Sequence, residues 1–133
     1  ASMAMTAHIV YGAWDSDHCA TLSHRIIRDV IRGDIGFDGL LMSDDLDMKA
    51  LAGSVPEVAL AAQQAGCDVV LNCWAKLSDM EGIAKRLASP GPDALNRMQR
   101  VCEALPSAQS PLTITARQQS LTQQRDELLA LLG

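Results

Sequence analysis

Two adjacent carboxylates, Asp44 and Asp45, stand one residue after the short apolar run Leu40-Leu41-Met42. A continuous apolar run bounded by glycines and polar residues is typical of a strand buried on both faces. In parallel α/β folds the ligands lie at the carboxyl ends of the strands, so the two acids fall where such folds carry out their chemistry. Aspartates also cap helices well, and the local pattern leaves open that the pair only begins the next helix.

An imidazole and an indole follow two other predicted strands. His8 lies near the end of a strand expected near residues 4–10, and Trp74 follows a strand expected near 68–72. Both side chains would therefore lie at the same edge of the sheet as the acids. For His8, a ligand-binding role and a hydrogen-bonded core role are equally open. Trp74 could contact a ligand or anchor the packing.

The composition indicates one domain with a substantial core. The chain has 133 residues, 48% of them apolar, and a formal net charge of −5. Its basic residues are scattered rather than gathered in a stripe, which argues against nucleic-acid binding. No apolar run approaches the roughly 20 residues of a membrane span. We therefore expect neither a nucleic acid nor a membrane as a partner.

The cysteines and histidines show no metal-binding spacing. The four cysteines contain no Cys-x-x-Cys pair, and the three histidines do not complete a metal-ligand pattern with them. Free thiols of a reducing compartment are favoured over disulfides. We expect no metal and no cofactor.

Strands and helices alternate along the first part of the chain. Strands are expected near residues 4–10, 39–43 and 68–72. Helices are expected at about 21–32, 54–65, 78–88, 93–104 and 115–132. Ser54 with Glu57, and Ser78 with Glu81, have the spacing of capping boxes. The arginines of the last two helices are expected to be solvated, namely Arg97, Arg100, Arg117 and Arg125.

This alternation favours a parallel sheet. A sheet of only three strands would leave two apolar edges open, which invites association. Either another part of the polypeptide completes the sheet, or several copies assemble. A (β/α)8 barrel needs roughly 250 residues, and this chain would supply its last three units and a helical tail from about residue 92. We therefore predict an α/β fold in which residues 1–133 form part of a TIM-type barrel, without the barrel's N-terminal part.

One long stretch resembles a known family. Residues 30–34 (VIRGD), residues 39–44 (GLLMSD) and Asp47 together resemble the active-site signature of the family 3 glycoside hydrolases. Residues 36–46 are most similar to the bacterial β-N-acetylhexosaminidases that recycle cell-wall fragments. The likeness covers at least residues 3–74.

The resemblance implies a (β/α)8-type barrel and retaining hydrolysis of terminal β-linked N-acetylglucosamine, in this branch from peptidoglycan-derived muropeptides in the cytoplasm. It places the family nucleophile on Asp44. A retaining glycosidase needs an ionised carboxylate beneath the anomeric carbon, and the end of a buried strand holds one rigidly. Asp45 would then position Asp44 or cap the loop. His8 could line the sugar site, and Trp74 could stack on a sugar ring.

Two parts of the family pattern do not occur in this sequence. In the family, the general acid/base is a His–Asp pair on an earlier loop, which also carries a sugar-binding Lys-His-Phe-Pro-Gly-His-Gly type motif. The chain alone is therefore expected to be inactive and to associate with the missing barrel half or with itself. The alternative is a non-catalytic α/β fragment that acts only by self-association through its open strand edges.

Overall fold

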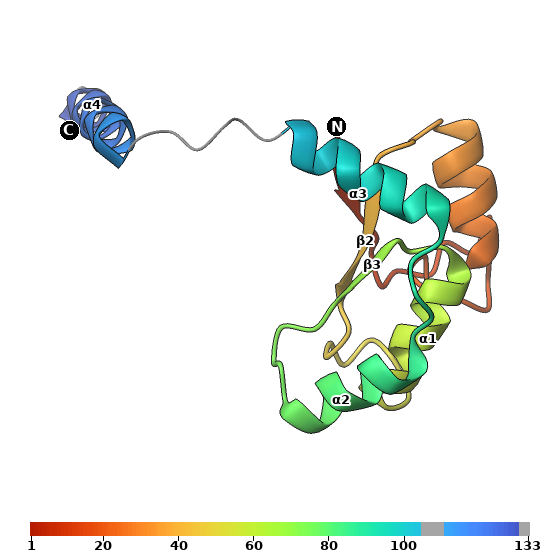
Figure 1. The fold of residues 1–133 in the computed structure, drawn as a ribbon. Coiled ribbons are helices and arrows are strands. Elements are labelled where there is room, and N and C mark those ends of the chain that lie inside the picture. Colours follow the sequence, from red (N-terminus) through yellow and green to blue (C-terminus); the bar gives the residue numbers. More distant parts are fainter. Residues whose placement is uncertain (105–110, 131–133) are drawn as a thin grey trace.

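A parallel sheet of three short strands forms the centre of the fold (Figure 1). The computed structural model describes residues 1–104 and 111–130, with side chains for all of these except 111–116, 128 and 129. The strands are β1 (Met3–Met5), β2 (Leu40–Asp45) and β3 (Val69–Leu71), which pair in chain order. Both pairings are parallel. The predicted mixed α/β class with parallel strands is confirmed.

The strands differ in length from the prediction. β1 ends at Met5 rather than near residue 10. Thr6 still donates its N–H to the carbonyl of Met42 at 2.8 Å, but its buried side chain bonds to Thr21, and the chain then leaves the sheet. β2 is longer than predicted and includes both aspartates.

Five helices accompany the sheet in the described residues. They are η1 (Ile26–Asp34), α1 (Val55–Ala65), α2 (Leu77–Arg86), α3 (Pro92–Ala104) and α4 (Pro111–Ala130). Figure 1 shows η1, in orange, and α1 on the same side of the strands. η1 is wound as a π-helix: the N–H of Ile35 bonds to the carbonyl of Val30, five residues back, at 2.8 Å. The predicted end of the last helix, near 132, lies outside the described residues.

Small side chains allow α1 to approach the sheet closely. Ala59 and Ala62 are fully buried and pack with Leu41 of β2 and Ile27 of η1. Gly66 ends α1 with φ +117°, a conformation that L side chains rarely adopt. A Cβ there would lie 2.9 Å from Cγ2 of Ile27, so glycine also permits the contact between the two helices.

Side chains cap the starts of two helices, and one of these caps is the predicted Ser54–Glu57 box. The N–H of Ile26 bonds to the Ser23 hydroxyl at 3.1 Å. The Glu57 carboxylate accepts hydrogen bonds from the N–H and the hydroxyl of Ser54, at 3.1 and 2.6 Å. The predicted Ser78 capping box is wrong, because α2 begins at Leu77 with Lys76 as its N-cap and Ser78 lies inside the first turn.

The amino ends of the strands are held by an ion-pair cluster that contradicts one prediction. The side chain of Asp68 is only 5% exposed and accepts from Arg32 at 2.8 Å and from Arg97 at 2.9 Å. Arg100 bonds to Asp38 at 2.9 Å. The prediction that Arg97 is solvated is therefore wrong, since its side chain is only 19% exposed. Arg100 is 55% exposed, as predicted, but also bonds to Asp38, so both arginines fasten α3 to the start of the strands.

The described side chains of α4, including Arg117 and Arg125, are exposed. None of the helices that the structure describes is both long enough and apolar enough to cross a membrane.

Candidate active site

Asp44 lies on the open face of β2, near the carboxyl end of the strand. Successive side chains of a strand point to opposite faces. Leu41 and Ser43 are fully buried, and Leu41 belongs to the core beneath the helices, so Met42 and Asp44 point the other way. Oδ1 of Asp44 accepts the N–H of Asp45 at 2.8 Å. Among the residues that the structure describes, no cation pairs with this carboxylate.

Asp45, in contrast, is tied into the fold. The register of β2 on β3 shifts between Met42 and Asp45, and such bulges re-aim side chains at the ends of strands. Oδ1 of Asp45 accepts the N–H of Cys73 at 3.0 Å and that of Asp47 at 3.3 Å. This carboxylate thereby joins the loop after β2 to the loop after β3. The two adjacent acids are both half-buried but have different partners: Asp44 accepts the N–H of its neighbour, whereas Asp45 joins two loops.

His8 binds protein groups through both ring nitrogens. Nε2 lies 2.9 Å from the carbonyl oxygen of Asp45, and Nδ1 lies 2.8 Å from the hydroxyl of Thr21. Thr21 in turn lies 2.9 Å from the hydroxyl of Thr6. A hydrogen bond from a ring nitrogen of His8 to a sugar would require one of these contacts to break, so the structure favours the hydrogen-bonded role over the sugar-binding one.

Trp74 stands at the tip of the loop after β3. Its side chain is 72% exposed, with the Lys76 ammonium 6.0 Å from the ring centroid. Oδ1 of Asn72 accepts the N–H of Ala75 at 3.2 Å, and Ala75 has the left-handed φ of 48°. The loop is therefore shaped by Asn72. Trp74 does not anchor the packing, which leaves ligand contact as the role still open for it.

Several residues at this edge were not singled out as site residues from the sequence. Oδ2 of Asp47 and Nδ2 of Asn72 are buried without a hydrogen-bond partner in the described part of the chain. Asp47 lies within the signature, and Asn72 is a polar residue directly after a strand, so position along the chain could have indicated both. No local pattern in the sequence indicated the hydrogen bonds of Thr6 and Thr21.

The thiols of the chain are free. Local desolvation and the neighbouring Asp45 carboxylate raise the pKa of Cys73 above its ordinary value. Burial raises the pKa of Cys67 to about 12. Within residues 1–104 and 111–130, no three His, Cys, Asp or Glu side chains gather into a group that could hold a metal ion.

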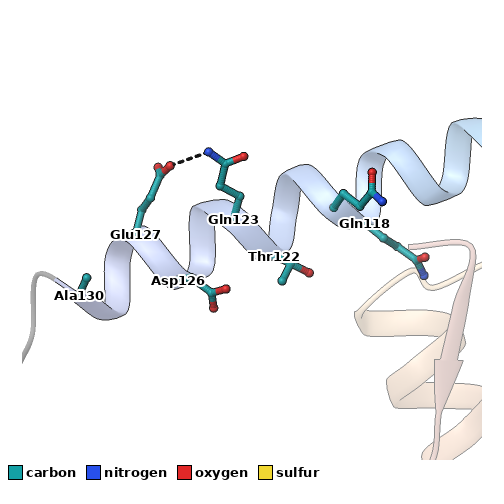
Figure 2. A pocket seen from close by; sticks show the side chains of 7 residues that line it. Gln118, Thr122, Gln123, Asp126, Glu127 and Ala130 are labelled. Carbon is teal, nitrogen blue, oxygen red and sulfur yellow. Dashed lines mark hydrogen bonds between the residues drawn. The ribbon is translucent and has the colours of Figure 1, made fainter.

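A hollow also runs along α4, far from the strands in sequence. Figure 2 shows that its lining side chains, such as Gln118, Thr122 and Asp126, come from one helix, with Gln123 bonded to Glu127 at 3.0 Å. A surface walled by a single helix cannot enclose a ligand as a pocket does. The carboxyl edge of the sheet, where three loops meet at Asp45, is the better candidate.

This edge lies within a region that matches a known domain. Residues 1–104 match the glycosyl hydrolase family 3 N-terminal domain. The chain belongs to glycosyl hydrolase family 3. The resemblance inferred from residues 30–47 is therefore confirmed.

Relatives in family 3 are longer than this chain. A β-hexosaminidase of Alkalilimnicola ehrlichii is 42% identical over 100 residues, which are 73% of this chain and 27% of that protein. Another, of Photobacterium profundum, is 48% identical over 71 residues, which are 52% of this chain and 21% of that protein. The solved β-N-acetylglucosaminidase of Thermotoga maritima has a TM-score of 0.57 at 35% identity, covering 76% of this chain and 24% of that one. The chain spans about a quarter of the length of these relatives.

Proposed function

We propose that the complete polypeptide to which this chain belongs is a retaining β-N-acetylhexosaminidase with Asp44 as its nucleophile. The single observation that carries the proposal is the position of Asp44 in the family 3 signature, on the open face at the carboxyl end of a parallel strand. The names of the relatives support the reaction class.

In this mechanism Asp44 attacks the anomeric carbon of the sugar, and the glycosidic bond breaks as its oxygen takes a proton from an acid outside this chain. A carboxylate oxygen of Asp44 is then bonded to the sugar. Water attacks the same carbon and gives its proton to the outside group that acted as the acid, so the bond to Asp44 breaks and the original configuration is restored. The N–H of Asp45 bonds to Asp44 Oδ1 and would orient this carboxylate before attack. Asp45 itself holds the loops together.

We further propose that the three strands are neighbouring strands of a (β/α)8 barrel. The parallel order β1-β2-β3 supports this arrangement, as does the apolar face opposite the helices, where Met3 and Met5 are exposed. In a barrel these side chains would point inward. The remaining strands would come from elsewhere in the complete polypeptide.

The proposed substrates are muropeptides that carry terminal β-linked N-acetylglucosamine, met in the cytoplasm. Trp74 offers an exposed aromatic face on the loop after β3, suited to the apolar face of a sugar ring. Four free cysteines agree with a reducing compartment.

The test compares Asp44→Ala with Asp38→Ala, an acid that precedes the same strand at its opposite end. With a chromogenic N-acetylglucosaminide, we expect Asp44→Ala to lower kcat of the complete polypeptide on the order of 10⁴-fold, as removal of a covalent nucleophile does. Asp38→Ala should keep the rate. Azide added to Asp44→Ala should restore turnover and give the α-glycosyl azide, since it enters from the face that the carboxylate occupied.

Equal rates for Asp44→Ala and the unaltered polypeptide would remove Asp44 from the mechanism, and no turnover by the unaltered polypeptide would reject the activity. The 133-residue chain alone is expected to show no detectable rate.

The second candidate is a non-catalytic role through self-association. It is favoured by β1, which within the described residues pairs with one strand only and carries exposed apolar side chains. Its test is the oligomeric state of the chain alone.

A further inference from the structure

We propose that His8 is a positioning residue for Asp44, acting through the backbone carbonyl of Asp45. The inference rests on the proposed function and adds to it a residue that does not touch the sugar. It follows from a line of hydrogen bonds that begins at the buried Thr6 hydroxyl and ends at the peptide beside the proposed nucleophile.

The direction of each hydrogen bond in this line follows from the carbonyl at its end. A carbonyl oxygen can only accept, so Nε2 of His8 carries the proton in the 2.9 Å contact with Asp45. In the neutral ring Nδ1 is then the acceptor, and the Thr21 hydroxyl donates to it at 2.8 Å. Thr21 has no second proton, so it accepts from Thr6 at 2.9 Å. All four groups are satisfied by one arrangement of protons.

The surroundings keep this arrangement in place. Thr6 and Thr21 are buried, so water does not compete for the inner hydroxyls. The Thr21 backbone is itself fixed, since its carbonyl accepts the Cys67 thiol at 3.9 Å, and the raised pKa of Cys67 keeps that thiol protonated. His8 is thereby fixed in orientation before it reaches Asp45.

Asp45 is the point where this line meets the nucleophile. Its carbonyl is held by His8, its carboxylate by the N–H of Cys73, and its own N–H is bonded to Asp44 Oδ1. The N–H of Asp47, in the loop after β2, also bonds to the Asp45 carboxylate. Loops that follow β1, β2 and β3 therefore all contact Asp45. Displacing a reacting group by about 1 Å can cost on the order of 100-fold in rate, so loss of one of these ties should slow attack.

Two substitutions of His8 distinguish a positioning role of its ring from a role in packing alone. His8→Gln can place an amide N–H where Nε2 stands, whereas His8→Asn is shorter and can reach only the Thr21 side. In the complete polypeptide, we expect His8→Gln to stay within about threefold of the unaltered kcat and His8→Asn to lose about 10- to 100-fold, with KM little changed. Hydrogen exchange of the peptide covering residues 40–47 should rise in His8→Asn alone.

Equal kcat for His8→Asn and the unaltered polypeptide would overturn the inference, as would equal losses in both His8 variants. If His8→Asn does not fold, His8→Leu decides, because it fills much of the same space without a donor to the Asp45 carbonyl: kcat must fall without a matching change in KM, and an unchanged kcat overturns the role. Should Asp44→Ala keep full activity, the proposed function fails. If Asp44→Ala is inactive and the His8 variants are normal, only the positioning role fails.

Discussion

Neighbouring carboxylates in a strand can serve different purposes because their side chains point to opposite faces. Asp44 is left without a cation among the described residues and receives one backbone N–H. The carboxylate of Asp45 accepts hydrogen bonds from two backbone N–H groups. A nucleophile must be accessible and a positioning group must be bonded, so each acid has the contacts that the role proposed for it requires.

The carboxylate of Asp15, away from the candidate site, should make the stability of the fold depend on pH. It accepts the Ser23 hydroxyl at 2.6 Å and the N–H groups of Asp17 and His18. The hydroxyl and these N–H groups lower the pKa of Asp15 to about 2, from an ordinary 3.8. Because the unfolded chain binds this proton more tightly, the stabilisation is complete above pH 4 and is lost as pH falls through 2.

We expect the melting temperature of the unaltered protein to fall between pH 4 and pH 2 more steeply than that of Asp15→Asn, as measured by circular dichroism. Asp17→Asn is the control, since the Asp17 carboxylate bonds only to the neighbouring Ser16 within the described structure, and it should keep the steep dependence. Parallel curves for the unaltered protein and Asp15→Asn would show that this carboxylate does not stabilise the fold.

At the scale of elements, the sequence predicted those strands and helix starts that depend on neighbouring residues along the chain. The apolar run before Asp44 is a buried strand, and the Ser54–Glu57 spacing does begin a helix. The same capping logic failed at Ser78, because the backbone is already helical one residue earlier. Local pattern placed Asp44 at a strand end but could not reveal the partners of His8.

Contacts between distant parts of the chain could not be predicted. Arg97 looks like a solvated helical arginine in its own segment, and its partners Asp38 and Asp68 lie 59 and 29 residues away. Thr21 likewise meets His8 only because the loop after β1 folds back. Hydrogen bonds of this kind depend on which elements pack together, a property that composition and periodicity do not contain.

The ion pairs at the amino ends of the strands predict a stability effect. The buried carboxylate of Asp68 accepts hydrogen bonds from the side chains of Arg32 and Arg97. It also accepts one from the N–H of Leu41. Asp68→Asn would leave two partly buried guanidinium groups without their carboxylate, which should cost on the order of 3 kcal/mol in urea unfolding. Hydrogen exchange over residues 92–104 should rise as α3 loosens.

Asp38→Asn is the matched control, because the Asp38 side chain is 69% exposed although it bonds to the same helix. Exposed ion pairs contribute little to stability. Asp38→Asn should therefore lower the free energy of unfolding much less than Asp68→Asn does. Equal destabilisation by both substitutions would mean that burial of Asp68 is not what makes the cluster stabilising.

For the whole molecule, the exposed apolar face of the sheet makes a prediction about association. β1 has one paired neighbour in the described structure, and Met5 on that strand is 50% exposed. Unpaired apolar strands associate, and a lysine at such an edge opposes this. We expect the chain alone to sediment as more than a monomer at tens of micromolar, a range typical of weak association, and Met5→Lys to shift it toward the monomer.

Met48→Lys serves as the comparison, because Met48 is 44% exposed but lies in the loop after β2 rather than on a strand. It adds the same charge and removes the same apolar side chain. If the open edge drives association, Met48→Lys leaves the sedimentation of the chain unchanged while Met5→Lys reduces it. A monomer at every concentration would remove self-association as a function of this chain, and equal effects of the two lysines would show that added charge, rather than the edge of β1, controls it.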